Sequence, residues 1–404
     1  MPPFVHGGDP AAPTSLRDAL LGVLAGDALT PEHAAALLAD ANGAALDAAL
    51  FAAARTRRAA TWGTTVTYSP KVFLPVTNLC RDRCTYCTFR KDPDDPDAWT
   101  MRPDDVAAWS ARGARLGCSE ALMCLGDRPE VAFRGYRETL HGLGHASTAS
   151  YVREACAIAL REGLLPHTNA GVLTRDEMAM LRPVNVSLGL MLESVSPRLR
   201  GRGEVHQWAP DKEPSVRLRM LREAGELRIP FTTGLLIGIG ETPAERVDTL
   251  VAIRDLHRAH GHVQEVIVQN FRAKPTIPRA DAPEPTALDL ARTIAVARLV
   301  LDAEVSVQAP PNLSPDDHRL LLRAGLNDWG GISPLTPDYV NPEAPWPHVA
   351  RLAETCAAEG FALVPRLPIY PAYLRGDDWL DPALRPYVAR GGKPASRAME
   401  GVSA

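Results

Sequence analysis

The sequence predicts an α/β fold in which parallel strands form a barrel, complete or partial. Short apolar, β-rich runs begin near residue 65 and alternate with segments of helical periodicity. This alternation is typical of parallel strands joined by crossover helices, as in a TIM-like (βα) barrel. The 404 residues, of which 46% are hydrophobic, suffice to bury one large core. We therefore expect one main domain with appendages.

The chain divides into three predicted parts. Residues 1–64 are Ala- and Leu-rich with helical spacing and predict an N-terminal helical extension. Within them, Thr30, Pro31 and Glu32 supply the N-cap hydroxyl, the first-position proline and the first-turn acid of a helix. Residues 65–374 predict the barrel, with substrate-binding loops at its carboxyl end. Residues 375–404 form a C-terminal tail, which we expect to be disordered from about residue 390.

The candidate strands are the apolar runs of the barrel region, and helical segments lie between most of them. The strands are expected at 72–76, 120–125, 165–169, 185–192, 231–237, 265–269, 305–308 and 331–332. The helices are expected at 102–116, 133–141, 151–161, 175–182, 214–222, 243–259, 287–301 and 315–324.

Charge and composition exclude several classes of partner. The net charge is −4, and no sustained Lys/Arg stripe with interleaved aromatic residues is present, so we expect no nucleic-acid partner. No apolar run approaches the length needed to cross a bilayer, and residues 1–13 lack the pattern of a secretion signal. These features predict a cytoplasmic protein without a membrane partner.

Three of the seven cysteines, Cys80, Cys84 and Cys87, lie within eight residues, directly after the first candidate strand. In a reducing cytosol, clustered thiols are more often metal ligands or catalytic groups than disulfides, and the odd count agrees. The other four are expected to be small buried hydrophobic residues. They are Cys118, Cys124, Cys156 and Cys356.

The spacing of Cys80, Cys84 and Cys87 suits three corners of a 4Fe-4S cluster and leaves the fourth iron without a protein thiolate. A structural zinc site normally has four ligands, and no fourth Cys or His pair stands nearby at the usual spacing. A ferredoxin-like electron carrier would also supply a fourth thiolate. A non-catalytic Fe-S or zinc scaffold remains the alternative from another class.

Chemistry in a βα barrel sits on the loops that follow the strands, so polar residues there are candidates for function. After the second to fifth candidate strands these are Gly126, Asp127, His167, Asn169, Glu193, Gly238 and Gly240. After the later strands they are Asn270, Arg272, Asn312, Asp328 and Trp329.

The three cysteines, with Tyr86 directly before the last one, resemble the cluster motif of the radical SAM enzymes. The resemblance implies a 4Fe-4S cluster whose open iron is chelated by S-adenosylmethionine, and cleavage of that molecule to a 5'-deoxyadenosyl radical. It implies that Gly126 and Asp127 contact the methionine amino group, although Asp127 departs from the commoner Gly-Gly-Glu, and that Glu193 binds the ribose. The further S-adenosylmethionine contacts would be Tyr86, Asn169, Thr233, Gly238 and Gly240.

Several sequence segments resemble those of the CofG family more specifically. Members of this family are a subunit of 7,8-didemethyl-8-hydroxy-5-deazariboflavin (FO) synthase. The resemblance covers about residues 65–374 and is carried by segments 68–73, 87–90, 126–130, 166–169, 191–194, 232–241, 308–313 and 328–334. It implies a lyase that cyclises 5-amino-5-(4-hydroxybenzyl)-6-(D-ribitylimino)-5,6-dihydrouracil to FO with loss of ammonia, in deazaflavin coenzyme biosynthesis. It also implies a CofH-type partner enzyme that supplies this adduct, and a one-electron donor.

Such a substrate has polyol, pyrimidine and phenol parts, for which loop residues offer hydrogen bonds and a stacking face. The expected substrate contacts are Gln269, Asn270, Arg272, Asn312, Asp328 and Trp329, and the expected proton carriers are Tyr68 and His167. The alternatives are that Trp329 caps the barrel core, that Arg272 pairs with a neighbouring acid, and that Tyr68 and His167 make structural hydrogen bonds.

The sequence leaves two questions open. A sister radical SAM enzyme, of the CofH type or of the aminofutalosine pathway to menaquinone, is the nearest alternative activity. The CofG family also occurs as the front half of a fused two-module protein, so the chain is either a separate subunit or one such half. It holds a single three-cysteine motif, and we expect only one of the two activities within it.

Overall fold

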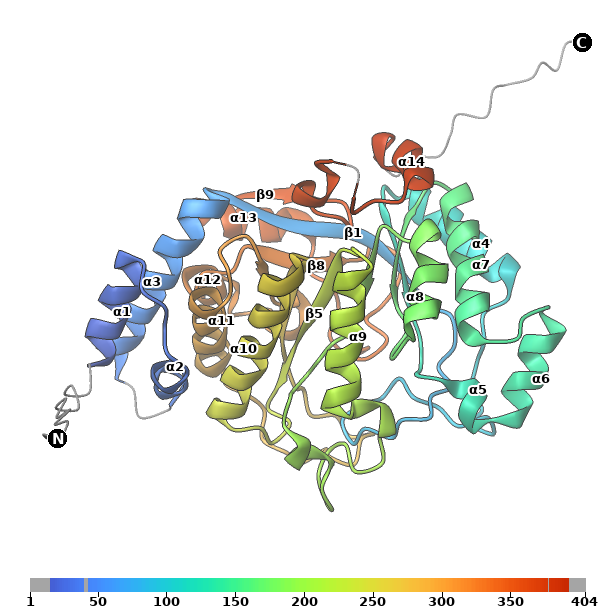
Figure 1. The fold of residues 1–404 in the computed structure, drawn as a ribbon, viewed down its shortest axis with the longest axis horizontal. Helices are drawn as coiled ribbons and strands as arrows, with labels where there is room; N and C mark the ends of the chain where they lie inside the picture. The colour runs from blue at the N-terminus through green and yellow to red at the C-terminus, as the bar shows by residue number, and fades with distance from the viewer. Residues whose placement is uncertain (1–14, 40–42, 377, 392–404) are drawn as a thin grey trace, which may run out of the picture.

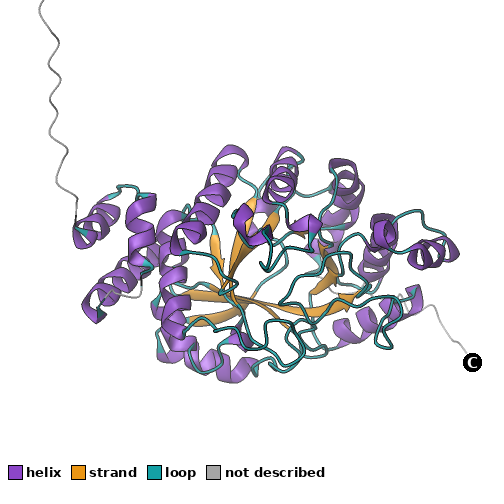
Figure 2. Cartoon of the chain, turned by 90° about the horizontal axis from the view of Figure 1, so that it is seen from below, coloured by secondary structure: helices purple, strands orange, loops and turns teal. Residues whose placement is uncertain are grey.

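The computed structural model describes residues 15–39, 43–376 and 378–391. Within these residues, eight parallel strands close into a barrel, and helices surround it (Figures 1 and 2). The strands are hydrogen-bonded in the order β2-β3-β4-β5-β6-β7-β8-β1, and β1 also pairs with β2. The predicted barrel is therefore confirmed and complete.

All eight candidate strands are present; β3 and β5 have the predicted ends, and the other six have shifted ends. They are β1 (Thr65–Pro75), β2 (Glu120–Cys124), β3 (Leu165–Asn169), β4 (Ser187–Gly189), β5 (Phe231–Ile237), β6 (Val263–Asn270), β7 (Ser306–Gln308) and β8 (Asp328–Ile332). A ninth strand, β9 (Ala362–Pro365), was not predicted from the sequence. It is short and mostly exposed, so it lacks the apolar run that marks a buried strand.

Strand β1 is longer than the sequence predicted because it has different partners along its length. Its first residues, Thr65–Tyr68, pair with β9, whereas Lys71–Pro75 pair with β2. The polar start of β1 does not look like a core strand, but it pairs with β9 and, from Thr67 onward, with β8. Tyr68 consequently lies in the amino-terminal half of the strand, away from the loops that follow the strands.

Within the described residues, at least one helix lies between each pair of successive strands. They are α1 (Leu16–Ala25), α2 (Pro31–Leu37), α3 (Ala44–Trp62), α4 (Pro103–Arg115), α5 (Pro129–Ala132), α6 (Arg134–Gly142), α7 (Thr148–Arg161), α8 (Arg175–Leu181), α9 (Pro214–Glu226), α10 (Pro243–His260), α11 (Ala287–Val300), α12 (His318–Arg323), α13 (Val349–Ala358) and α14 (Arg385–Ala389). Threonine side chains cap several of them, and the predicted cap Thr30 accepts the His33 N–H at 3.2 Å.

Helices α1–α3 pack against one side of the barrel, beside α10 and α11 (Figure 1). Their apolar side chains join the hydrophobic cluster that includes the outer faces of β5–β7. A buried ion pair fastens them: Asp47 on α3 accepts from Arg292 Nε on α11 at 2.7 Å. Arg58 on α3 also donates to the Leu326 carbonyl at 3.1 Å.

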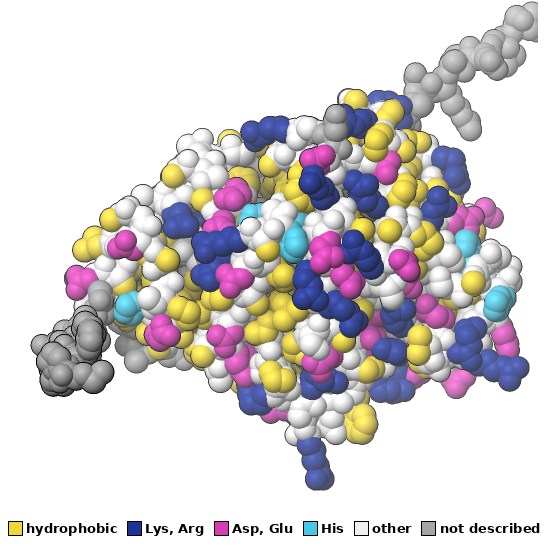
Figure 3. Space-filling view, in the orientation of Figure 1, with side chains coloured by type: hydrophobic (Ala, Val, Ile, Leu, Met, Phe, Trp, Pro, Cys, Tyr) yellow, Lys and Arg dark blue, Asp and Glu magenta, His cyan; other side chains and the backbone are white. Residues whose placement is uncertain are grey.

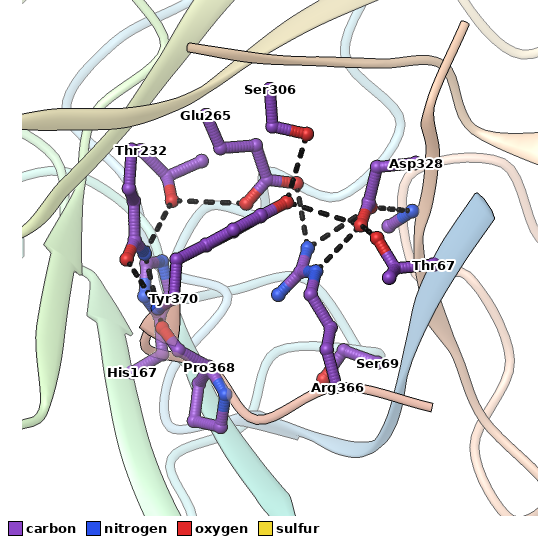
Figure 4. Close-up of polar contacts among 12 residues, drawn as sticks. Thr67, Ser69, His167, Thr232, Glu265, Ser306, Asp328, Arg366, Pro368 and Tyr370 are labelled. Atoms are coloured by element: carbon purple, nitrogen blue, oxygen red, sulfur yellow. Dashed lines mark hydrogen bonds and ion pairs between the residues drawn. The ribbon is translucent and has the colours of Figure 1, made fainter. Parts of the chain in front are cut away.

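The segment after β9 runs across the amino-terminal ends of the strands and forms the floor of the barrel (Figure 4). Arg366 lies between two buried carboxylates, 2.6 Å from Asp328 Oδ2 and 2.9 Å from Glu265 Oε1. The Tyr370 hydroxyl lies 3.0 Å from both Asp328 Oδ2 and Ser306 Oγ. The floor is thus a polar network instead of an apolar plug.

The surface carries both signs of charge. On the face in Figure 3, Lys and Arg side chains lie among Asp and Glu side chains and do not gather by sign. Among the described residues, no helix is long and apolar enough to span a membrane.

The Asp47–Arg292 pair generates a stability prediction. Asp47→Ala should lower the free energy of unfolding by about 3–5 kcal/mol, because it breaks a buried ion pair by removing one partner. Asp302→Ala is the matched control, since its partner Arg258 is half exposed, and should cost about 1 kcal/mol or less. Urea denaturation measures both, and equal losses would contradict the assigned role of the pair.

Candidate active site

One cavity, of about 380 Å³, occupies the inside of the barrel. Its wall extends from the three cysteines on the loop after β1 to Glu265 and Arg366 at the floor. Strand ends and following loops supply most of the wall, as expected for a βα barrel. The cavity is therefore reached from the carboxyl ends of the strands and ends on the polar network of the floor.

The loop with Cys80, Cys84 and Cys87 is fixed by hydrogen bonds to neighbouring loops. The Asp127 N–H donates to Cys80 Sγ at 3.1 Å, and the Arg83 N–H donates to the Trp208 carbonyl at 2.9 Å. Gly126 permits this close approach, because a Cβ there would lie 2.1 Å from the Leu79 carbonyl oxygen. The loop after β2 is therefore packed directly against the cysteine loop.

The three thiols fit a multi-iron cluster better than a single metal ion. All three line the cavity, and none is in a disulfide. Two sulfurs bound to one zinc ion, each at about 2.3 Å, lie at most about 4.6 Å apart. Among the described residues, the only group of three potential ligands within 4.8 Å of one another is a set of carboxylates. The sulfurs are thus too widely spaced for one zinc ion.

Burial disfavours the thiolate form of Cys80 and Cys84, so that form requires a nearby positive charge. Burial raises the pKa of Cys80 to about 12, with the nearby carboxylate of Asp82 adding to the effect, and it raises the pKa of Cys84 as well. A bound metal would supply the charge that stabilises the thiolates. Lys212 lies close enough to Cys84 to act in the same direction.

Glu193 ties the cysteine loop to the end of the fourth βα unit. Its carboxylate accepts from the Tyr86 hydroxyl at 2.6 Å, lies 3.2 Å from His206 Nε2 and pairs with Lys212. Burial alone would raise the pKa of Glu193, but the charges of Lys212 and Arg217 and the hydrogen bond with His206 together hold it well below its ordinary value. Glu193 is therefore an ionised acceptor in the cavity wall.

The backbone at Glu193 is unusual, with φ at 64° in the left-handed region. The Glu193 N–H donates to the Gly234 carbonyl at 2.8 Å, and the Leu192 N–H donates to Thr233 Oγ1 at 3.3 Å. These bonds to β5 hold the conformation, which few non-glycine residues adopt without strain.

A second buried group lies beside Cys80. The carboxylates of Asp82, Asp127 and Asp211 lie within 4.8 Å of one another, and Arg81 pairs with Asp211. Burial, and then the charge of Asp211, raises the pKa of Asp127 to about 7. The Val172 N–H donates to the Asp127 carboxylate at 3.1 Å.

Four charged residues in or beside the cavity wall were not predicted from the sequence. Asp82 lies inside the cysteine motif, but Asp211, Lys212 and Arg217 lie on the short turn before α9 and on α9 itself. No spacing rule connects them to Glu193. The only available signal was a pair of charged residues, Asp211 and Lys212, before a proline-started helix.

Most of the predicted site residues do meet at the cavity. Its wall includes the three cysteines and, further, Tyr86, Gly126, Asp127, His167, Asn169, Glu193, Gln269, Asn270, Arg272 and Trp329. Asn270 is 4% exposed, and its Oδ1 has no partner among the described residues while its Nδ2 donates to the Leu313 carbonyl. An acceptor without a partner in the wall of a cavity is free to accept a hydrogen bond from a ligand or a water molecule.

The structure corrects the predicted positions of Tyr68 and Asp328. Neither lines the cavity. Tyr68 lies in the first half of β1 and packs against the hydrophobic cluster outside the barrel, so the structure does not bring it to the cavity. Asp328 begins β8 instead of a loop, and its carboxylate belongs to Arg366 in the floor.

Trp329 was also predicted on a loop, and the structure places it in β8. It is fully buried, and its ring packs edge-on against His318 at 4.9 Å between centroids. The side chain therefore packs in the hydrophobic core, beside the cavity wall. Arg272 pairs with the neighbouring acid Glu284 at 3.0 Å, and Asn312 lies outside the wall and donates to Asp338 at 3.0 Å.

Thr233, Gly238 and Gly240 also lie outside the cavity wall. Thr233 supports Leu192, as described above. The Gly238 N–H donates to Glu241 Oε1 at 2.8 Å, and both glycines have positive φ, 87° and 108°. They therefore form the turn from β5 into α10, which requires glycine, and the prediction that they approach an adenine is not supported.

Comparisons with known proteins agree with this site. A family model described as the radical SAM superfamily matches residues 74–253, which include the cysteine loop, Asp127 and Glu193. The barrel, the cavity faced by Cys80, Cys84 and Cys87, and this match define a radical SAM enzyme. The family implies a 4Fe-4S cluster and S-adenosylmethionine as cofactors, and the three thiols fit the cluster.

Closer relatives specify the family. The chain is 51% identical over 311 residues to the 7,8-didemethyl-8-hydroxy-5-deazariboflavin synthase of Methanopyrus kandleri. The match covers 77% of this chain and 93% of that relative. The chain is 52% identical over 340 residues to the FO synthase of Mycobacterium tuberculosis H37Rv, covering 82% of this chain but only 40% of that relative. The chain belongs to the 7,8-didemethyl-8-hydroxy-5-deazariboflavin synthase family. It spans less than half the length of the FO synthases.

Solved structures support the fold alone. The hydrogenase maturase HydG from Carboxydothermus hydrogenoformans has a TM-score of 0.71 at 20% identity, covering 93% of this chain and 87% of that one. Methylornithine synthase has a TM-score of 0.67 at 18% identity, covering 87% and 97%.

The cysteine loop yields a prediction on cluster binding. Alanine at position 80, 84 or 87 should abolish binding of the 4Fe-4S cluster, because each thiol supplies one corner. Iron and sulfide per chain, with the visible absorption spectrum, are the measurements after anaerobic reconstitution. Cys118→Ala, which removes a buried thiol outside the cavity, should keep the full cluster. A complete cluster in any loop variant would refute that ligand.

Glu193 yields a prediction on S-adenosylmethionine binding. Glu193→Ala should weaken binding by about tenfold or more while the cluster remains, since a hydrogen bond to a charged group contributes about 1.5–3 kcal/mol. Equilibrium dialysis with labelled S-adenosylmethionine measures the affinity. Glu245→Ala, which removes an acid paired with Arg198 outside the cavity, is the control. An unchanged affinity in Glu193→Ala would exclude Glu193 as a contact.

Proposed function

We propose that this chain cyclises 5-amino-5-(4-hydroxybenzyl)-6-(D-ribitylimino)-5,6-dihydrouracil to 7,8-didemethyl-8-hydroxy-5-deazariboflavin, with loss of ammonia. The observation that carries the proposal is the 51% identity to the Methanopyrus kandleri synthase over 93% of its length. The three-thiol loop facing one barrel cavity supports it, because this chemistry needs a cluster and a substrate in one enclosed space.

The cofactors would bind at the upper wall of the cavity. Cys80, Cys84 and Cys87 would hold the cluster, Asp127 would receive the methionine ammonium, and ionised Glu193 would accept from the ribose hydroxyls. When bound, the cluster and S-adenosylmethionine supply one-electron cleavage of a carbon–sulfur bond and so a radical able to remove a hydrogen atom from the substrate. Lys212 and Tyr86 fix the direction of the Glu193 carboxylate.

The substrate would lie between the cofactors and the floor. Four carboxamide side chains reach the cavity wall from the ends of β3, β6 and β7, and they are Asn169, Gln269, Asn270 and Gln308. Each offers both a donor and an acceptor, which suits the alternating carbonyl and N–H groups of a pyrimidinedione and the hydroxyls of a ribityl chain. The Arg366 network below them closes the barrel and excludes bulk water from the reacting atoms.

A CofH-type enzyme is the proposed supplier of the adduct, and a one-electron donor is the second proposed partner. The supplier would be a separate polypeptide or a further module.

Turnover of the reconstituted chain tests this proposal. The reconstituted chain, given a reductant, S-adenosylmethionine, tyrosine, 5-amino-6-ribitylaminouracil and a CofH-type enzyme, should produce a fluorescent deazaflavin and 5'-deoxyadenosine together. Omission of the CofH-type enzyme should abolish the deazaflavin. Formation of 5'-deoxyadenosine without deazaflavin in the complete mixture would refute the proposal and favour a sister radical SAM activity.

A further inference from the structure

His167 stands in the middle of β3 and lines the lower part of the cavity. A neutral imidazole has one nitrogen that donates and one that accepts, and the hydrogen bond made by one nitrogen sets the character of the other. The surroundings of His167 contain backbone groups whose polarity is fixed. They therefore determine which nitrogen of this ring faces the substrate space as an acceptor.

The chain of hydrogen bonds starts in the floor segment after β9. The Tyr370 N–H, which can only donate, lies 3.1 Å from Gln264 Oε1. The amide nitrogen of Gln264 accordingly donates to the Pro368 carbonyl at 3.0 Å. The Pro368 oxygen, which can only accept, is thus directed toward β4 and β6.

Ser187 on β4 connects this carbonyl to the histidine. Ser187 Oγ lies 2.6 Å from the Pro368 oxygen, and two oxygens this close require a hydrogen between them. The single hydroxyl hydrogen of Ser187 is therefore directed to Pro368. Ser187 Oγ also lies 2.7 Å from His167 Nδ1, so Nδ1 must donate to it. Nε2 then carries no hydrogen and presents a lone pair.

The other side of the ring is open to the cavity. Among the described residues, none makes a hydrogen bond with His167 Nε2, and the residue belongs to the cavity wall. Gly189 makes room for it, because a Cβ at that position would lie 2.8 Å from Nε2. Figure 4 shows His167 beside Pro368 at the edge of the floor network.

We propose that Ser187 and the Pro368 carbonyl are positioning groups that keep His167 in its Nδ1–H form, so that Nε2 accepts a hydrogen bond from the substrate. The identity of the substrate rests on the proposed function, which supplies ring N–H groups and ribityl hydroxyls as donors. If the proton is transferred, it passes from the substrate nitrogen or oxygen to Nε2. The electron pair then stays on the substrate atom.

The charges around the ring agree with an acceptor. Burial, countered in part by Glu120 and reinforced by Lys71 and Arg366, lowers the pKa of His167 to about 4. The lone pair on Nε2 is therefore available throughout the range from pH 6 to 8. The Glu120 carboxylate, 2.8 Å from Lys71 Nζ, is the group that would stabilise an imidazolium formed by proton transfer.

The test is the nitrogen-15 NMR spectrum of histidine-labelled full chain, with the His167 signals assigned by comparison with His167→Asn. Wild-type protein should show a protonated Nδ1 and an unprotonated Nε2, unchanged between pH 6 and 8. Ser187→Ala should shift His167 toward the Nε2–H form, and Ser187→Thr, which keeps the hydroxyl, should restore Nδ1–H. Ser110→Ala, which removes an equally buried hydroxyl without a partner, should leave the signals unchanged.

Turnover supplies the second measurement. Ser187→Ala should lower the yield of deazaflavin about tenfold or more and leave S-adenosylmethionine affinity unchanged, because loss of a positioned acid–base group costs 10²–10⁴-fold and a mixed tautomer loses part of that. A wild-type Nε2–H tautomer, or wild-type tautomer and turnover in Ser187→Ala, would overturn the inference. A wild-type chain with the Nδ1–H form that makes no deazaflavin would overturn the proposed function and support the tautomer assignment.

Discussion

The pairing of Arg366 with Asp328 and Glu265 is the interaction on which the rest of the structure depends. It joins the segment after β9 to β6 and β8 inside the barrel, where removal of Arg366 would leave two buried carboxyl groups without their cation. Burial raises the pKa of Glu265 to about 7, with Arg366 opposing the shift, so the network is close to neutral in charge. The floor closes the lower end of the cavity and places the Pro368 carbonyl within hydrogen-bonding distance of Ser187.

The upper end of the cavity is organised around a second buried acid. Glu193 receives Tyr86 from the cysteine loop and Lys212 from the turn before α9, so one carboxylate aligns three separate segments. The two ends therefore use the same physical device, a buried carboxylate with a cation and a hydroxyl. Between them, neutral carboxamides leave donors and acceptors for a ligand.

The sequence predicted the parts of this arrangement that depend on local pattern. The spacing of Cys80, Cys84 and Cys87 and the strand end at Glu193 are visible in the chain, and both reach the cavity. It failed at Tyr68 and Asp328, because pairing with β9 and a buried ion pair, both made by residues beyond 360, decide where they lie. Lys212, Arg217 and Ser187 were invisible for the same reason, since their roles come from contacts between distant segments.

The most direct measurement of the account is a crystal structure of the reconstituted chain with 7,8-didemethyl-8-hydroxy-5-deazariboflavin bound under anaerobic conditions. The account predicts that the tricyclic ring lies inside the barrel, between the cysteine loop and Arg366, with a ligand donor within hydrogen-bonding distance of His167 Nε2. A product bound outside the barrel, or a cavity filled by side chains when the product is present, would contradict it.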